Sequence, residues 1–188
     1  MYRWDIPERY ANKNIGEYQY DTANYLSFIN GVSLKQDGSV SPVIKYDVND
    51  KFLKKYDCIP NSSGIPIVSK RLKGFLECYA SNEAEFHHVD IYAENELIHD
   101  FYLLNIIKKA PLIDLNNSIY IYIPGTQEIM TFNRVCFVDD QLTDFNITRC
   151  SEYLPYIMLS NELVGRMKKE KFKGIEYTKV MTTSELQQ

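Results

Sequence analysis

The chain has 188 residues, of which 45% are hydrophobic, and these values suit one globular domain with a core of its own. Its net charge of −4 argues against nucleic-acid binding, which normally needs a basic surface. No apolar run is long enough for a transmembrane helix, and the charged first residues lack the apolar segment of an export signal, so we expect a cytoplasmic protein without a membrane partner.

The first forty residues show no lasting hydrophobic period. We predict one or two short strands there, with turns at Asn30-Gly31 and Asp37-Gly38. Residues 41–48 alternate weakly and are predicted to form a strand. Residues 50–64 are predicted to be a connector with helical tendency, which ends at Pro60 and a polar turn.

Two distant segments share one pattern, an apolar run that ends in a serine and continues as an amphipathic helix. Ser69 and Ser160 are predicted N-caps, because a serine hydroxyl can accept from the free N–H groups of the first turn. Gly74 and Gly165 coincide when the segments are aligned, and we expect another element to pack close to the helix at Gly74. Gly174 is the predicted C-terminal glycine of the second helix. Helical spacing places apolar stripes at Leu72, Phe75, Leu76 and Tyr79, and at Leu163, Val164 and Met167.

The sequence between these two units is rich in predicted strands, over residues 86–94, 99–109, 118–125, 130–140 and 144–149. The first two are expected to meet at an Asn95-Glu96 turn, and a last strand is predicted over residues 175–180. The apolar stripe of each helix must cover a sheet. We therefore predict a single α+β domain, with an antiparallel or mixed sheet covered by two Ser-capped helices. The repeated pattern is compatible with a loose internal duplication.

Residues that could carry chemistry are few. His87 and His88 are neighbours on a predicted strand, so they point to opposite faces and would not bind one metal ion together. The four cysteines are far apart, which predicts reduced thiols. Acidic clusters, at Glu83/Glu85, Glu94/Glu96 and Asp139/Asp140/Asp144, fit solvated turns, a metal or glycosidase site, or a surface for a basic partner. Fifteen tyrosines and nine phenylalanines fit either cross-strand aromatic pairs or a protein-binding surface.

Four short motifs occur in a distinctive order. They are a helix start (Val68, Ser69, Leu72, Leu76, Glu77), a strand (Tyr102, Leu104, Asn105), a turn (Ile113, Asp114, Ser118) and a closing segment (Ser160, Gly174, Ile175, Tyr177). Together they resemble a family of bacterial immunity proteins from polymorphic toxin systems, named for a Myxococcus member. The resemblance covers about residues 40–178. We treat residues 1–188 as a single immunity-type domain, with a core over 41–180 and an unmatched segment over 1–40.

The resemblance implies an inhibitor that binds a cognate toxin domain acting in the cytoplasm, with no catalytic, cofactor or metal site of its own. From the acidic clusters we predict the partner-binding residues Asp139, Asp140 and Asp144, together with the turn at Glu94 and Glu96. Two alternatives stay open. One is a small metal-dependent hydrolase that uses Asp139, Asp140 and His99, and the other is a non-enzymatic regulatory or scaffold module.

Overall fold

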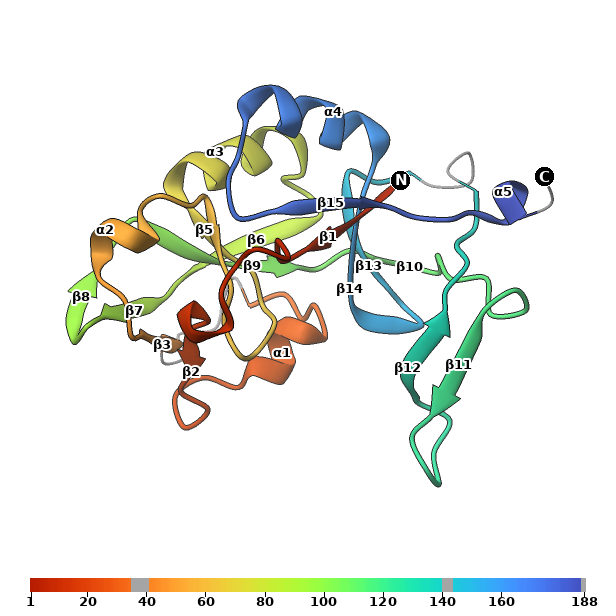
Figure 1. The fold of residues 1–188 in the computed structure, drawn as a ribbon, viewed down its shortest axis with the longest axis horizontal. Coiled ribbons are helices and arrows are strands. Elements are labelled where there is room, and N and C mark those ends of the chain that lie inside the picture. Colours follow the sequence, from red (N-terminus) through yellow and green to blue (C-terminus); the bar gives the residue numbers. More distant parts are fainter. Residues whose placement is uncertain (35–40, 140–143, 187–188) are drawn as a thin grey trace.

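The computed structural model describes residues 1–34, 41–139 and 144–186. They form an α+β domain in which the two Ser-capped helices lie together over the sheets (Figure 1). The predicted fold class is therefore confirmed. Within the described residues, no helix is both long and apolar enough to cross a membrane.

The largest sheet has five strands in the order β10-β13-β14-β1-β15, and only the β10–β13 pair is parallel. Strand β1 comes from the start of the chain and lies between β14 and β15, so the N-terminal segment joins the main sheet. The strands are β1 (Tyr2–Asp5), β10 (Lys109–Ala110), β13 (Ile147–Cys150), β14 (Tyr153–Leu159) and β15 (Glu176–Lys179).

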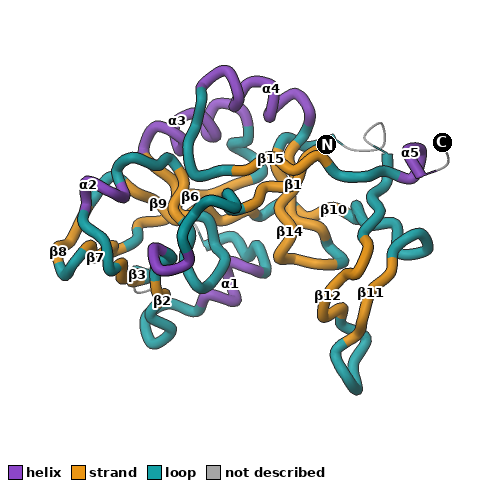
Figure 2. The backbone as a smooth tube through the Cα atoms, in the orientation of Figure 1, coloured by secondary structure: helices purple, strands orange, loops and turns teal. Residues whose placement is uncertain are grey.

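Two smaller sheets have four strands each. The antiparallel sheet, in the order β4-β5-β9-β6, contains β4 (Cys58–Ile59), β5 (Ile67–Ser69), β6 (Ala84–His88) and β9 (Phe101–Ile106). The mixed sheet, in the order β2-β3-β7-β8, contains β2 (Glu17–Tyr18), β3 (Val43–Tyr46), β7 (Asp90–Ala93) and β8 (Glu96–Ile98). A separate hairpin of β11 (Ile119–Tyr122) and β12 (Ile129–Arg134) projects from the body of the molecule (Figure 2).

The repeated sequence pattern corresponds to a repeated topology. In each unit a two-stranded hairpin leads into a helix: β4–β5 into α3 (Lys70–Tyr79), and β13–β14 into α4 (Asn161–Glu170). The next strand along the chain, β6 after α3 and β15 after α4, runs parallel to the last hairpin strand. An antiparallel strand from elsewhere in the chain, β9 or β1, lies between them. Both units are therefore βαβ crossovers split by an inserted strand.

The serine caps form as predicted. The Ser69 hydroxyl accepts from the Leu72 N–H at 3.2 Å, and the Ser160 hydroxyl accepts from the Leu163 N–H at 3.0 Å. Both helices contribute to one core with strands of the two sheets beneath them, through Leu72, Leu76, Leu163, Val164 and Met167. The shorter helices are η1 (Asn12–Asn14), α1 (Tyr25–Ile29), α2 (Asp50–Leu53) and α5 (Thr183–Leu186).

Two predictions about glycines are wrong. A Cβ atom added at Gly74 would meet nothing within 4 Å, so no element packs against the helix there. Helix α4 ends with Lys171 in the left-handed conformation, at φ 56°, and Gly174 is not its cap. Gly174 instead has φ +88° and lies against the backbone of Cys58 in the other unit. Its role is close packing between the two units.

Predictions over residues 86–100 also need correction. Residues 86–94 divide into β6 and β7 of different sheets, separated at Val89. The turn after β7 lies at Glu94 and Asn95, which both have positive φ, and Asp100, at φ 79°, separates β8 from β9. The short strands expected within the first forty residues are β1 and β2, whereas helix α1, with Asn24 as its N-cap, was not predicted. The predicted turn at Asp37-Gly38 lies outside the described residues.

Candidate partner-binding site

A pocket opens where strand β1 separates from β14. The two strands pair at Tyr2↔Leu159 and Arg3↔Met158, and pairing then stops, while β1 continues along β15 as far as Asp5↔Glu176. The same register would place Ile6 opposite Pro155, which has no N–H to donate to a ladder. The two strands are already unpaired at this position, and a cavity of about 580 Å³ lies beside them.

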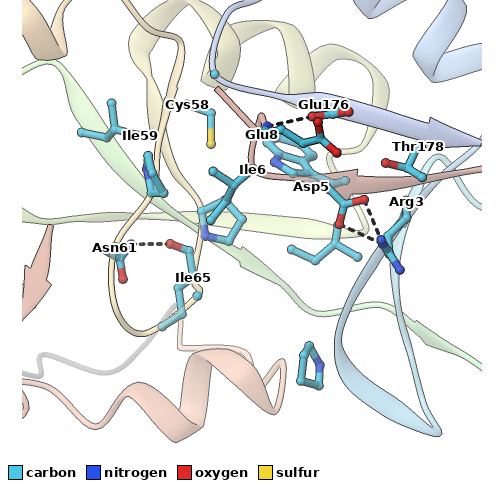
Figure 3. Close-up of a pocket in the computed structure, with 17 residues that line it drawn as sticks. Arg3, Asp5, Ile6, Glu8, Cys58, Ile59, Asn61, Ile65, Glu176 and Thr178 are labelled. Atoms are coloured by element: carbon cyan, nitrogen blue, oxygen red, sulfur yellow. Dashed lines mark hydrogen bonds and ion pairs between the residues drawn. The ribbon is translucent and has the colours of Figure 1, made fainter. Parts of the chain in front are cut away.

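The pocket lies at the junction of the two repeated units (Figure 3). Strands β1, β14 and β15 of the second unit form one side, and the β4–β5 connection of the first unit forms the other. Backbone hydrogen bonds from Asp57 and Cys58 to the carbonyl oxygen of Lys173 hold the units together beside it. The walls are largely apolar, with Trp4, Ile6, Ile59, Pro60, Ile65, Pro66, Pro155 and Ile157.

Three carboxylates and one guanidinium also line this pocket. Arg3 Nε contacts both carboxylate oxygens of Asp5, at 2.8 and 2.9 Å, so these two charges offset each other. Glu176 accepts a hydrogen bond from the Glu8 backbone N–H at 3.1 Å. Among the described residues neither Glu8 nor Glu176 has an ion-pair partner. The pocket therefore combines apolar walls with two uncompensated negative charges.

The Cys58 thiol also lies in the pocket wall. Burial raises the pKa of Cys58 to about 12, although a hydrogen bond with Trp4 acts in the opposite direction. The thiol therefore stays protonated at neutral pH and adds no charge. It is an inert part of the wall, because the thiolate is the reactive form of cysteine.

An aromatic cluster connects the pocket with the projecting hairpin. The Arg3 guanidinium lies 4.8 Å from the ring centroid of Tyr156, and the Tyr156 and Phe132 rings stack with centroids 6.0 Å apart. Phe132 also packs against Tyr153 at 5.5 Å, which holds the inner face of the hairpin to the body. The pocket and the hairpin are therefore connected through Arg3 and the aromatic side chains of β14.

The hairpin exposes large apolar side chains. Ile119 and Ile121 are 48% and 44% exposed, and Tyr122 and Met130 are each 49% exposed. Only Glu128 carries a charge in the stretch from Asn116 to Asn133. Neighbouring exposed apolar side chains of this kind mark surfaces that contact other proteins.

The sequence matches a family model described as "Immunity protein family (Imm11)" over residues 2–182. The chain belongs to the Imm11 immunity protein family. The match includes the first forty residues, which in this immunity protein supply β1 of the main sheet. No curated protein matches the sequence.

The predicted partner-binding residues of this immunity protein do not form one patch. Asp139 accepts from the Ser184 hydroxyl at 2.7 Å and so holds helix α5, while the backbone oxygen of Asp144 accepts from Lys108. Glu94 and Glu96 lie at the β7–β8 turn, at the other end of the molecule from α5 (Figure 1). Asp140 lies outside the described residues. Contact of these residues with a partner stays a prediction.

The residues of the hydrolase alternative are also separated. His99 lies between β8 and β9, whereas Asp139 lies beside α5 at the opposite end (Figure 1). In the described part of the chain, no three His, Cys, Asp or Glu side chains are grouped in a way that could hold a metal ion. The pocket could not be predicted from the sequence, since its residues come from four distant segments. Pro155 within a strand was the one available signal.

Proposed function

We propose that this immunity protein neutralises a cognate toxin domain by stoichiometric binding, in the cytoplasm of a bacterium that uses polymorphic toxins in competition. The family match over residues 2–182 carries the proposal. Binding blocks the catalytic cleft or the substrate path of the toxin, so the immunity protein needs no chemistry of its own.

The surface around the hairpin supports this function. A two-stranded hairpin is marginally stable alone, and here one face is secured by Phe132 while the other presents Ile119 and Ile121 to solvent. Apolar anchors of this kind, surrounded by polar residues, supply most of the affinity in protein interfaces. An exposed apolar projection of this kind is typical of a surface that contacts another protein.

The proposal predicts that a toxin domain is encoded directly upstream of the gene for this chain, and that domain is the partner to test. Co-expression of both is expected to restore the growth of bacteria that the toxin domain alone arrests. The purified proteins should also form a one-to-one complex in light scattering after gel filtration. Growth arrest that persists despite comparable soluble amounts of both proteins would contradict the proposal.

A further inference from the structure

We infer that the pocket between β1 and β14 receives one lysine or arginine side chain of the toxin domain. The inference rests on the proposed function and adds the place and the chemistry of one contact. It depends on three properties of the pocket, namely its charge, the nature of its walls and its position beside the hairpin.

The charge favours a cation. The Glu8 and Glu176 carboxylates lack an ion-pair partner among the described residues, whereas the Asp5 carboxylate is already held by Arg3. Glu8 is joined to Glu176 through its backbone N–H, so the two side chains belong to one small part of the rim (Figure 3). A cationic group between them would gain charge-assisted hydrogen bonds, which are stronger than neutral ones.

The walls favour a cation on a long apolar stem. Lysine and arginine side chains bury their methylene groups along apolar surface while the charged end reaches a polar rim. Trp4, Ile6 and Ile65 provide such a surface in the same pocket as the carboxylates. Trp4 also places an aromatic side chain in this wall, and aromatic rings attract guanidinium and ammonium groups. A small inorganic cation would leave these apolar walls unused.

The position favours a side chain of the same partner that covers the hairpin. Pro155 and Ile157 of β14 line the pocket, while Tyr153 and Tyr156 of the same strand contact Phe132 in the hairpin. A partner domain that covers the hairpin and the adjoining part of β14 can therefore also extend a basic residue into the pocket. Such a pair of sites gives an apolar anchor and a charged anchor on one surface.

The chain provides its own reporter, because Trp4 is its one tryptophan and lines the pocket. Protein grown with 5-fluorotryptophan therefore gives a single ¹⁹F resonance from this site. We expect acetyl-arginine-methylamide to shift this resonance in a saturable way. The neutral isostere acetyl-citrulline-methylamide should leave it unchanged at equal concentrations. Equal shifts with both compounds, or no shift with either up to their solubility limits, would overturn the inference.

A second experiment measures affinity for the toxin domain. Glu8→Gln/Glu176→Gln removes both charges and keeps an oxygen that accepts the Glu8 N–H, and we expect it to weaken binding by at least about tenfold. Asp47→Asn/Asp100→Asn removes two exposed carboxylate charges outside the pocket and should change affinity less than about twofold. Unchanged affinity of the pocket variant, or an equal loss in both variants, would overturn the inference while the proposed function stands. Failure of the unmodified chain to bind would instead contradict the proposed function.

Discussion

Asp57 of the first repeated unit and Asn146 of the second occupy equivalent positions. Each precedes the first strand of its hairpin, and its carbonyl oxygen accepts from the backbone N–H of the capping serine, at 2.7 Å for Ser69 and 3.0 Å for Ser160. Each side chain also reaches the other unit. Asp57 accepts from the Lys173 N–H at 2.9 Å, and Asn146 donates to the Tyr79 carbonyl at 2.7 Å. Hydrogen bonds from these two equivalent residues therefore hold the two units together.

Asp57→Asn is expected to reduce stability at neutral pH. The Asp57 carboxylate also receives two hydrogen bonds from Arg71, at 3.0 and 2.8 Å. Hydrogen bonds to a charged group contribute more than neutral ones, so we expect the free energy of unfolding at pH 7 to fall by about 1–3 kcal/mol. Urea denaturation of both proteins measures the difference. Asn146→Asp, the opposite exchange at the equivalent position, should also lower stability, because the Asn146 amide donates to the Tyr79 carbonyl oxygen and a carboxylate cannot.

The difference in stability between Asp57→Asn and the unmodified chain is expected to depend on pH. Burial tends to raise the pKa of Asp57, but hydrogen bonds from Arg71 and the Lys173 backbone hold it below its ordinary value of 3.8. A depressed carboxylate pKa stabilises the fold above the unfolded pKa of about 3.9 and loses this effect as pH falls through the folded value. The stability difference should be constant from pH 5 to pH 8 and decrease below about pH 4. A difference that is unchanged at pH 3 would contradict this account.

Local patterns predicted local structure well. The serine caps, the apolar stripes of α3 and α4 and the strands of the hairpin all depend on residues close in sequence. The repeat of Ser69 and Ser160 even pointed to a repeated topology. Contacts between residues far apart in the sequence could not be predicted, because nothing near Asp5 or Glu176 indicates that they meet across β1 and β15. The strand over residues 86–94 shows the same limit, since a change of sheet at Val89 leaves no periodic signal.

Gly174→Ala is expected to be strongly destabilising. A Cβ atom at this position would lie 1.9 Å from the Cys58 carbonyl oxygen, and φ is +88°. The backbone strain and the clash each cost about 1–3 kcal/mol, so the loss should exceed 2 kcal/mol. Gly64→Ala is the control, because Gly64 also has positive φ, +72°, but a Cβ there meets nothing within 4 Å. Equal losses in thermal or urea unfolding would show that close packing is not the reason for Gly174.

Gly74→Ala and Gly165→Ala are expected to stabilise the protein. Both glycines lie mid-helix on exposed faces, and an added Cβ has open space at either position. Alanine is favoured over glycine within helices by about 1 kcal/mol, chiefly because it restricts the unfolded chain. The sites are on different helices, so the two gains should add in the double variant. A lower melting temperature in either single variant would contradict the open space found there.

Arg149→Met is also expected to stabilise the protein. The Arg149 side chain is fully buried, and of its nitrogens Nη1 donates to the Leu154 carbonyl at 2.7 Å while Nε and Nη2 have no partner among the described residues. Burial lowers the pKa of Arg149 to about 10, so a charged group is held in an apolar setting at neutral pH. Removal of this charged group should raise the free energy of unfolding by about 1 kcal/mol, a net value that includes the loss of one hydrogen bond.

The sign and pH range of this effect follow from the lowered pKa. The folded state binds the Arg149 proton less tightly than the unfolded state, so the destabilisation is complete below pH 10 and disappears as pH rises further. The gain in Arg149→Met should therefore be the same at pH 6 and pH 8 in urea denaturation. A variant that unfolds more easily than the unmodified chain would show that the guanidinium has a stabilising partner.

Ile119→Thr/Ile121→Thr is expected to weaken toxin binding by at least about tenfold, since apolar anchors dominate protein interfaces. Threonine keeps the β-branched shape that suits a strand, and both side chains are about half exposed, so stability should change by less than about 0.5 kcal/mol. Leu97→Thr is the matched control, because Leu97 is 44% exposed on β8 at the far end of the sheets. Titration calorimetry with the toxin domain measures all three proteins. Equal affinities for the hairpin variant and the unmodified chain would show that the toxin does not bind at the hairpin. An equal loss of affinity in Leu97→Thr would show that the effect is general to exposed apolar residues.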